Sequence, residues 1–401
     1  MSAPNFDKLT AYLKSLETDF GVPGLDLKIM KDHEVVYRHF QGYSDYEKKC
    51  PMNGNELYDI YSASKVITMV AVMQLVEKGI LKLDDPVTKY IPAFADAKVA
   101  DGYELGKYPF VRPDDHGPMH SPKNAITLER LMSMTGGLSY DLDHPRFKKL
   151  VEETNGKATT REVVDEIAKL PLLYEPGTRY NYSLGHDVRA AVVEVASGER
   201  FADYVQHHIF DPLGITDMYY HPGEAEKARM AAQWTIPVGP WMMKEDEYAK
   251  RIEPAPTGNR YRVSENYDSG GAGVTASVDA YATFVDALAC GGVGANGARI
   301  ITQASLDEMK KPRLDEQQLK DFGRFGIGYS YGLGVRTLAN PAVSKSPIGE
   351  FGWDGAAGAF CMVDTDNHLS LYYGQEVLMM PQIYFKAHPM IRDLTYEALG
   401  L

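Results

Sequence analysis

Residues 61–79 place the strongest constraint on how this chain can fold. The helical part of this segment is apolar around nearly its whole circumference, through Val66, Ile67, Met69, Val70, Val72, Met73, Leu75 and Val76. A helix that is hydrophobic on every face is stable only where other elements cover all of its sides. We therefore predict a helix that is buried on all sides. The chain has 401 residues, enough for two or three domains or one large two-lobed body with a sizeable core.

The segments around this helix have different patterns. Residues 6–16 carry apolar side chains at three- and four-residue spacing, which predicts an amphipathic helix. Residues 25–37 alternate in polarity around the turn Lys31-Asp32-His33, which predicts a hairpin. Beyond residue 81, short helical patterns are divided by Pro and Gly loops, as in a helical lobe. The last third predicts a helix near residues 278–288, a closing helix, and strands at residues 329–337, 349–353, 359–363 and 369–373.

Composition and charge exclude several classes of protein. Asp and Glu number 55 against 42 Lys and Arg, and no dense basic cluster is present, so a nucleic-acid partner is not expected. No run approaches the roughly 18 apolar residues of a membrane span, and the first residues lack the pattern of a secretory signal. We expect a cytoplasmic protein without a membrane partner. The three cysteines, Cys50, Cys290 and Cys361, are far apart and are expected to be free thiols.

The motif Ser62-Ala63-Ser64-Lys65 is the first candidate for catalytic chemistry. It matches a Ser-x-x-Lys pattern at the start of the hydrophobic helix, and a three-residue step puts Ser62 and Lys65 on one helix face. Burial of the lysine would lower its pKa from about 10.4 towards neutrality, so that it could take the proton of the serine. The alternative is that Ser62 caps the helix and Lys65 is solvated, since the pattern also occurs by chance.

Two other candidates are weaker. The motif GYSYG at residues 328–332, with Ser330, matches the Gly-x-Ser-x-Gly nucleophile elbow, but strand residues follow it where an elbow needs a helix. We interpret its glycines as allowing close packing in a sheet. The 11 histidines include no HExxH or comparable spacing, and His207 and His208 are adjacent within a helical pattern. A zinc site or other metal site is therefore not expected.

Longer blocks resemble the serine beta-lactamase and penicillin-binding-protein superfamily, in particular the class C beta-lactamase-like carboxylesterases called family VIII esterases. The blocks follow the order of that family over nearly the whole chain: YSASKVITMVAVMQLVEKGILKLDDPVTKYIP, ITLERLMSMTGGLSYD, PGTRYNYSLGHDVRAAVVEVASG, GGAGVTASVDAYATFVDAL and FGWDGAAGAFCMVD. The resemblance implies an α/β lobe with an antiparallel sheet flanked by helices, from residues 1–80 and 265–401. An all-helical lobe with substrate-side loops, residues 81–264, would be inserted between the two parts.

The resemblance also implies roles for individual residues. Ser62 would be the acyl-accepting nucleophile, with Lys65 as its proton partner and Tyr182 as the tyrosine that acts with the lysine as general base and then protonates the leaving group. Such a tyrosine needs a lowered pKa, which an adjacent ammonium favours. Tyr180 is a rival but does not fit the family spacing. The backbone N–H groups of Ser62 and Ala356 would form the oxyanion hole.

Two departures from the family pattern concern substrate recognition. Leu184 stands where the family has an asparagine, and Trp353-Asp354-Gly355 stands where penicillin-recognising members have Lys-Thr-Gly. These four residues are the expected substrate-binding positions, but neither an amide nor a lysine is present to hold a penicillin. Asp354 is expected to repel a substrate carboxylate, unless it points away into a surface hydrogen bond.

We therefore expect a serine hydrolase that cleaves small carboxylic esters through a Ser62 acyl-enzyme, without metal or organic cofactor. A D-amino-acid amidase or aminopeptidase and an acyltransferase are alternatives with the same chemistry. A beta-lactamase and a non-catalytic binding or sensor protein are weaker alternatives. The expected partner is a small ester or amide. Which acyl and alcohol groups the protein accepts depends on the conformations of the loops at residues 103–120 and 234–266. The sequence gives no indication of the oligomeric state.

Overall fold

An eight-stranded antiparallel sheet carries most of the fold. The computed structural model describes residues 4–106, 112–236, 252–255, 258–323 and 326–401. The strand order brings the last third of the chain beside the first fifty residues. In that order the strands are β11 (Tyr329–Tyr331), β12 (Arg336–Leu338), β13 (Phe351–Gly352), β14 (Phe360–Asp364), β15 (Leu369–Gly374), β1 (Gly24–Lys31), β2 (Glu34–Asp45) and β3 (Cys50–Pro51).

The predicted hairpin is confirmed as β1 and β2, joined by the turn that contains Asp32 and His33. Both turn residues have positive φ, 51° and 67°, which is what a two-residue hairpin turn requires at its central positions. The other edge of β1 pairs antiparallel with β15, with Leu27 opposite Tyr373. The hairpin is thereby fixed to the C-terminal part of the sheet.

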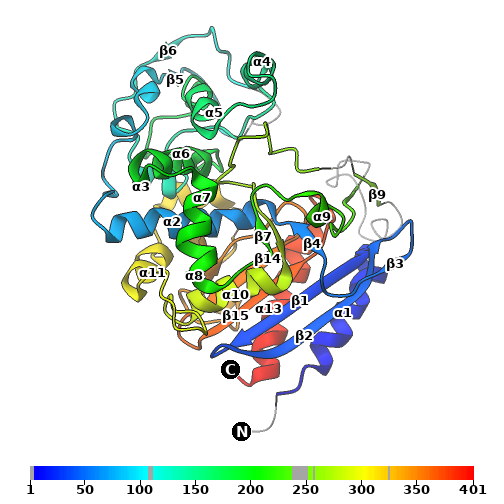
Figure 1. Cartoon of the computed structure of the whole chain (residues 1–401). Helices are drawn as coiled ribbons and strands as arrows, with labels where there is room; N and C mark the ends of the chain where they lie inside the picture. The colour runs from blue at the N-terminus through cyan, green and yellow to red at the C-terminus, as the bar shows by residue number, and fades with distance from the viewer. Residues whose placement is uncertain (1–3, 107–111, 237–251, 256–257, 324–325) are drawn as a thin grey trace.

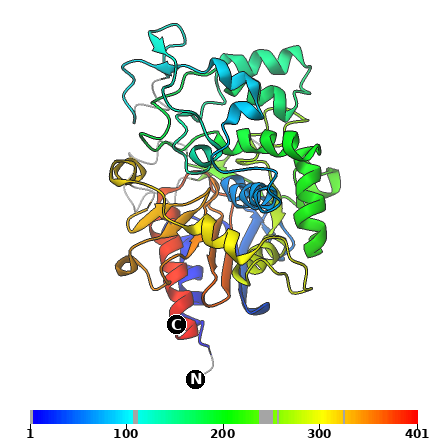
Figure 2. The same ribbon diagram turned by 90° about the vertical axis from the view of Figure 1, so that its left-hand side faces the viewer.

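Helices cover both faces of the sheet. Because successive side chains of a strand point to opposite faces, neighbouring residues of one strand pack against different helices. In β14, Phe360 and Met362 pack in the cluster with α1 (Asp7–Phe20) and α13 (His388–Leu399), whereas Cys361 and Val363 pack in the larger cluster that contains α10 (Val278–Ala289). The helices α1 and α13 lie side by side (Figures 1 and 2), and the Asn5 N–H before α1 donates to the Ala398 carbonyl oxygen of α13 at 3.1 Å. The helix predicted for residues 6–16 is α1, and the closing helix is α13.

The central helix α2 (Ser64–Glu77) is buried on all sides, as the sequence predicts. Twelve of its 14 residues, Ser64 to Leu75, are buried. It packs against α6 and α7, and the helix-rich part of the chain lies above it in Figure 1. The other α-helices of the described residues are α3 (Leu128–Met132), α4 (Pro145–Glu153), α5 (Thr160–Ile167), α6 (Gly185–Ser197), α7 (Phe201–Val205), α8 (Asp211–Leu213), α9 (Glu224–Lys227), α11 (Gln303–Lys310) and α12 (Glu316–Phe322).

Helices are the main regular elements of the segment 81–264, but loops and strands also occur in it, which corrects the expected all-helical lobe. It contains two-residue strands: β5 (Val99–Ala100) pairs with β6 (Met119–His120), β8 (Trp234–Thr235) pairs with β9 (Glu253–Pro254), and β7 (Met218–Tyr219) joins a sheet with β4 (Leu57–Asp59) and β10 (Thr275–Ser277). Strands this short are too brief to show a period of two in the sequence. The lobe boundaries at residues 80 and 265 remain a prediction.

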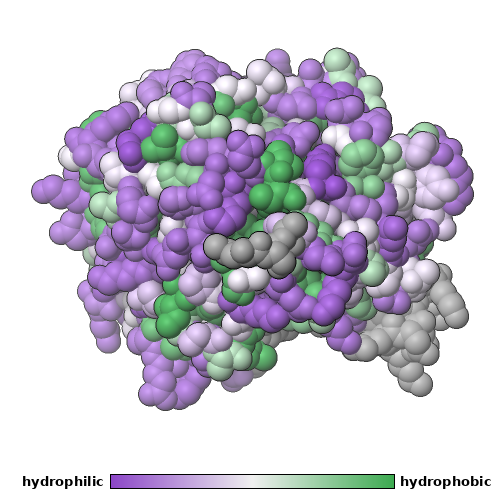
Figure 3. Space-filling view, turned by 90° about the horizontal axis from the view of Figure 1, so that it is seen from below, coloured by the Kyte–Doolittle hydropathy of each residue, from purple (hydrophilic) through white to green (hydrophobic). Residues whose placement is uncertain are grey.

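The surface is polar over most of the face that Figure 3 shows. Apolar residues occur there in small separate groups, as is normal for a surface in contact with water. Within the described residues, no helix has the length and apolar character needed to cross a membrane.

The packing of α1 against the sheet can be tested by truncating one of its buried side chains. Leu13 is completely buried, so Leu13→Ala should lower the free energy of unfolding by about 2–5 kcal/mol, through lost apolar contact and the cavity left behind. Its exposed neighbour is the matched control, because Lys14→Ala should change stability by less than about 0.5 kcal/mol. Urea unfolding of the three proteins measures both values. Equal effects of the two substitutions would show that α1 does not pack as described.

Candidate active site

Ser62 lies in a short 3₁₀ turn, Tyr61–Ala63, that runs directly into α2. The turn holds Tyr61 at a φ of 45°, an uncommon conformation for a residue with a side chain. Two contacts hold the Tyr61 ring there: its hydroxyl donates to Gln233 Oε1 at 2.9 Å, and its ring packs edge-on against Tyr261. Ser62 is 9% exposed, so its hydroxyl is close to solvent without being freely solvated.

The structure brings Ser62 and Lys65 together as predicted from their spacing. The Lys65 Nζ donates to Ser62 Oγ at 3.1 Å and to the carbonyl oxygen of Gly271 at 2.8 Å. Lys65 is 0% exposed, and burial lowers the pKa of its amine to about 7; Asp187 opposes this shift and Arg189 adds to it. The alternative of a solvated lysine is therefore wrong.

Asp187 and Gly271 set the position of this buried amine. Asp187 Oδ1 accepts hydrogen bonds from the Tyr267 hydroxyl at 2.6 Å and the Ser269 hydroxyl at 2.7 Å, and so is held firmly in the interior. A side chain at position 271 would come within 2.8 Å of Asp187 and 3.3 Å of the Lys65 Nζ. Glycine is therefore required where the loop approaches the lysine most closely.

Tyr182 lies immediately before α6 and contacts Lys65. The Lys65 Nζ is 4.7 Å from the centre of the Tyr182 ring, and Trp353 Nε1 donates to the Tyr182 hydroxyl at 3.1 Å. Burial raises the pKa of Tyr182 well above its ordinary value; nearby Tyr331 adds to this, and hydrogen bonding to Ser62 and Trp353 only partly offsets it. This corrects the expected lowered pKa. Burial disfavours the phenolate, and the hydrogen bonds offset this only in part, so the hydroxyl stays protonated.

The rival Tyr180 lies in a different environment. Its ring packs edge-on against Phe322 and Tyr331, at 5.1 and 5.6 Å between ring centres. Its hydroxyl is buried and has no hydrogen-bond partner among the described residues. Of the two tyrosines, Tyr182 is the one whose ring the Lys65 ammonium approaches.

The segment after β13 runs close to the nucleophile turn. A side chain on Gly355 would collide with the carbonyl oxygen of Ile60, two residues before Ser62. The Tyr384 hydroxyl donates to the carbonyl oxygens of Gly355 and Ala356, at 3.0 and 2.7 Å, which fixes the orientation of these peptides. The Ala356 N–H has no acceptor within the described part of the chain. These features are compatible with the predicted oxyanion hole.

Asp354 forms an ion pair with Arg336. This agrees with the alternative expectation that its carboxylate points away from the substrate into a contact within the protein. Its carboxylate accepts from Arg336 Nη1 at 2.6 Å and lies 3.7 Å from His388 Nδ1. Burial alone would raise the pKa of Asp354, but Arg336 and His388 together hold it below its ordinary value. The expected repulsion of substrate carboxylates is not supported, because Arg336 compensates the negative charge.

Leu184 is completely buried in the core at the start of α6. Its side chain therefore does not line an accessible surface, in contrast to its expected place among the substrate-binding residues. Trp353 is also buried, but it stacks on Tyr182, one of the predicted catalytic residues, at 5.5 Å between ring centres. Of these two side chains, only that of Trp353 contacts the predicted catalytic residues.

Ser330 lies inside the sheet, as the sequence context indicates. It belongs to β11, which pairs antiparallel with β12, so a strand and not a helix follows it. Its hydroxyl is buried and has no hydrogen-bond partner among the described residues. The motif GYSYG is not a nucleophile elbow.

Several site residues were missed by the sequence analysis. Tyr140 stacks on Tyr182 with ring planes 2° apart and 5.3 Å between centres, and its hydroxyl lies 3.5 Å from the Lys65 Nζ. Tyr261 packs edge-on against Tyr140. Tyr140 is the last residue but one of the block ITLERLMSMTGGLSYD, but only the three-dimensional arrangement shows that it contacts Lys65. Asp187 was also missed, because only the fold brings it close enough to Lys65 to influence the pKa of the amine.

Comparison with known proteins identifies the family. The profile of the Beta-lactamase family matches residues 9–374. The chain is 28% identical to esterase EstB of Burkholderia gladioli over 367 residues, covering 86% of this chain and 83% of EstB. It is 27% identical to protein Rv1367c of Mycobacterium tuberculosis over 345 residues, covering 83% of this chain and 80% of the relative.

Solved structures have the same fold as this protein over nearly the whole chain. EstCE1, a hydrolase with promiscuous acyltransferase activity, superposes with a TM-score of 0.76 at 22% identity and covers 97% of both chains. A family VIII carboxylesterase superposes with a TM-score of 0.72 at 18% identity and covers 99% of both chains. The antiparallel sheet flanked by helices is thereby confirmed as a beta-lactamase fold. The chain belongs to the Beta-lactamase family, and within the superfamily of beta-lactamases and penicillin-binding proteins it is similar to the family VIII carboxylesterases.

Proposed function

We propose that this protein hydrolyses small carboxylic esters through an acyl-enzyme on Ser62. The observation that supports this most strongly is the hydrogen bond of 3.1 Å between Ser62 and a fully buried lysine whose pKa is about 7. An amine with a pKa this low is partly unprotonated at neutral pH and can then accept a proton. A base with a pKa near the working pH is the best suited to this task.

In the first half of the reaction, Lys65 takes the proton of Ser62 as Oγ attacks the ester carbonyl carbon. The carbonyl oxygen becomes negatively charged, and the backbone N–H groups of Ser62 and Ala356 stabilise it. Tyr182, whose hydroxyl remains protonated, donates its proton to the departing alkoxide. Lys65 returns a proton to Tyr182, so an alcohol leaves and the acyl group stays on Ser62.

In the second half, water attacks the acyl carbon while Lys65 again accepts a proton. The bond between the acyl carbon and Ser62 Oγ breaks, and Oγ regains a proton. The products are a carboxylic acid and free enzyme, and no cofactor takes part in this scheme.

The surroundings of Ser62 favour neutral esters over penicillins. Tyr140, Tyr182 and Trp353 form a stacked aromatic row beside Lys65, which suits an apolar acyl or alcohol group. Trp353 replaces the lysine that attracts a substrate carboxylate, and the nearby Arg336 is bound to Asp354. The name of the relative EstB, an esterase, points in the same direction.

The acyl-enzyme is common to esterase, amidase, aminopeptidase and acyltransferase reactions, so a substrate panel separates these activities. The panel contains chromogenic short-chain esters, D-amino-acid amides and a cephalosporin, with Ser62→Ala as the blank. We expect the esters to be the best substrates. Efficient turnover of the cephalosporin would contradict the proposal, and acyl transfer to added alcohols would show that water is not the preferred acceptor.

Replacement of the nucleophile gives the first test. Ser62→Ala should remove nearly all ester hydrolysis, because no other described serine is hydrogen-bonded to Lys65. Ser330→Ala is the matched control and should keep most of the activity, since the Ser330 hydroxyl is buried in the sheet. Mass spectrometry after phosphonate treatment should locate the adduct on the peptide that contains Ser62. An adduct on Ser330 would refute the assignment.

The pH dependence tests the role of Lys65. Activity should rise with pH through about 7, because the amine must lose its proton before it can act as a base. Asp187→Asn should move this rise to lower pH, since the Asp187 carboxylate raises the pKa of Lys65. Profiles of kcat/KM for both proteins measure the shift. A rise that begins only near pH 10, or a shift in the opposite direction, would exclude Lys65 as the titrating base.

Removal of one hydroxyl tests Tyr182 as the proton donor. Tyr182→Phe should lower kcat by about 10²–10⁴, the usual contribution of a positioned general acid, while the ring stacking keeps the fold intact. Tyr180→Phe is the matched control and should leave kcat nearly unchanged. Steady-state kinetics measures kcat for both variants, and circular dichroism checks that they are folded. Loss of activity in Tyr180→Phe together with retention in Tyr182→Phe would reverse the assignment.

A further inference from the structure

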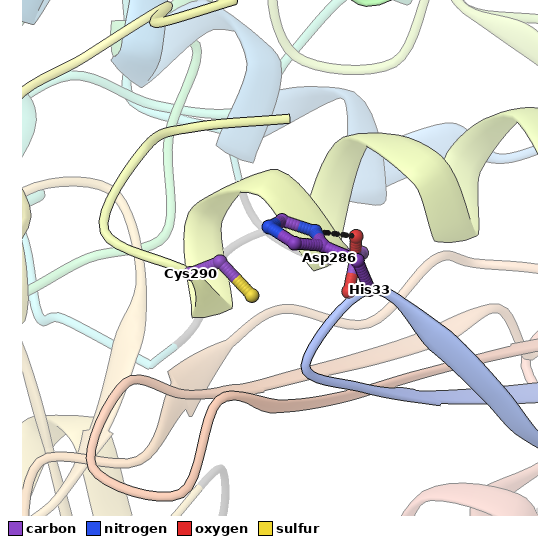
Figure 4. A group of neighbouring side chains, drawn as sticks. All are labelled: His33, Asp286 and Cys290. Atoms are coloured by element: carbon purple, nitrogen blue, oxygen red, sulfur yellow. Dashed lines mark hydrogen bonds and ion pairs between the residues drawn. The ribbon is translucent and has the colours of Figure 1, made fainter. Parts of the chain in front are cut away.

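Three side chains able to bind metal meet at one end of α10, outside the Ser62 site. His33 lies in the turn between β1 and β2, whereas Asp286 and Cys290 lie at the C-terminal end of α10. One ligand atom from each residue lies within 4.8 Å of the other two. Figure 4 shows the three side chains gathered between the turn and the helix. The sequence analysis did not find this group because more than 250 residues separate His33 from Asp286.

The helix itself brings two of the three residues together. Asp286 and Cys290 are four residues apart, and the Cys290 N–H donates to the Asp286 carbonyl oxygen at 3.0 Å, which continues the helical turn. Residues at this spacing lie on the same side of a helix. The hairpin then brings His33 against this side, with its Nδ1 2.7 Å from Asp286 Oδ2.

The Asp286 carboxylate has one oxygen with no partner. The residue is 2% exposed, and its Oδ1 is buried without a hydrogen bond to any described residue. A buried carboxylate oxygen without a partner is costly, because it has lost its water and gained nothing in return. The basic side chains Lys31 and His368 lie nearby among the described residues, but both pair with Asp32 and not with Asp286.

We propose that His33, Asp286 and Cys290 bind a divalent transition-metal ion, with Zn²⁺ as the ion that best fits the ligands. A thiolate, an imidazole and a carboxylate form a mixed S, N and O set, which suits Zn²⁺ better than Mg²⁺ or Ca²⁺. The ion replaces the thiol proton of Cys290, which is released to solvent. Water completes a tetrahedral site.

The metal would join the β1–β2 hairpin to α10 without entering the proposed reaction. The Tyr281 hydroxyl of the same helix donates to the carbonyl oxygen of Ala63, next to Ser62, at 2.8 Å. Nine residues separate Tyr281 from Cys290, about 13 Å along a helix axis. The ion therefore binds about 13 Å along α10 from the residue that contacts the Ser62 turn, and it acts as a cross-link between the hairpin and this helix.

Titration of the full, chelator-treated protein with Co²⁺ tests this proposal. Co²⁺ is a spectroscopic substitute for Zn²⁺, and a thiolate ligand gives it a charge-transfer absorption that carboxylate and imidazole ligands do not. We expect one Co²⁺ per chain with this absorption, its displacement by Zn²⁺, and a higher Tm with Zn²⁺ than without.

Variants identify the ligands. Cys290→Ser should abolish the charge-transfer absorption, and His33→Ala should weaken Zn²⁺ binding about 100-fold or more, at least the effect seen for residues that only support a ligand. Cys50→Ser is the matched control, because Cys50 is exposed and should leave the absorption unchanged. Circular dichroism is used to check that each variant is folded. Ester hydrolysis is followed separately, so the result does not depend on the proposed function.

Two outcomes would overturn the proposal. One is the absence of stoichiometric Co²⁺ and Zn²⁺ binding to the wild-type protein. The other is a charge-transfer absorption that persists in Cys290→Ser or disappears in Cys50→Ser.

Discussion

The burial of the Lys65 amine against Ser62 is the interaction on which the rest of the site depends. An ammonium group in the core is unfavourable, and the protein meets this by lowering the pKa of Lys65 to about 7. This follows from the position of Lys65 on α2, which is buried on all sides and packs with α6 and α7 in the larger core cluster. The buried helix at the centre of the core thus also lowers the pKa of the lysine, as its proposed role as a base requires.

The surrounding residues keep the amine in place once it is buried. The Gly271 carbonyl oxygen accepts one of its hydrogen bonds, and the Asp187 carboxylate keeps its pKa from falling further. Tyr182 and Tyr140 place their rings beside Nζ, where the negative face of an aromatic ring attracts a cation. The same burial raises the pKa of Tyr182, so one environment shifts the two groups in the directions that their proposed roles as base and acid require.

The parts of this arrangement that depend on local spacing could be predicted from the sequence. The contact of Ser62 with Lys65 follows from a three-residue step on a helix, and the β1–β2 hairpin from alternating polarity. Family resemblance pointed to Tyr182, but the sign of its pKa shift was wrong because burial is not visible in a sequence. The partner of Asp354 was also hidden, since Arg336 reaches it from the neighbouring strand β12, and Asp187 meets Lys65 only through the fold.

The pKa of Lys65 in the folded protein is the most direct test of the central claim. The chain is prepared with ¹³C at the ε-carbon of its lysines, and the NMR signals are followed as a function of pH. The Lys65 signal is assigned by its absence from the spectrum of Lys65→Arg. We expect one lysine that titrates near pH 7, well separated from the others. A Lys65 signal that titrates near pH 10.4, the ordinary value for lysine, would contradict it.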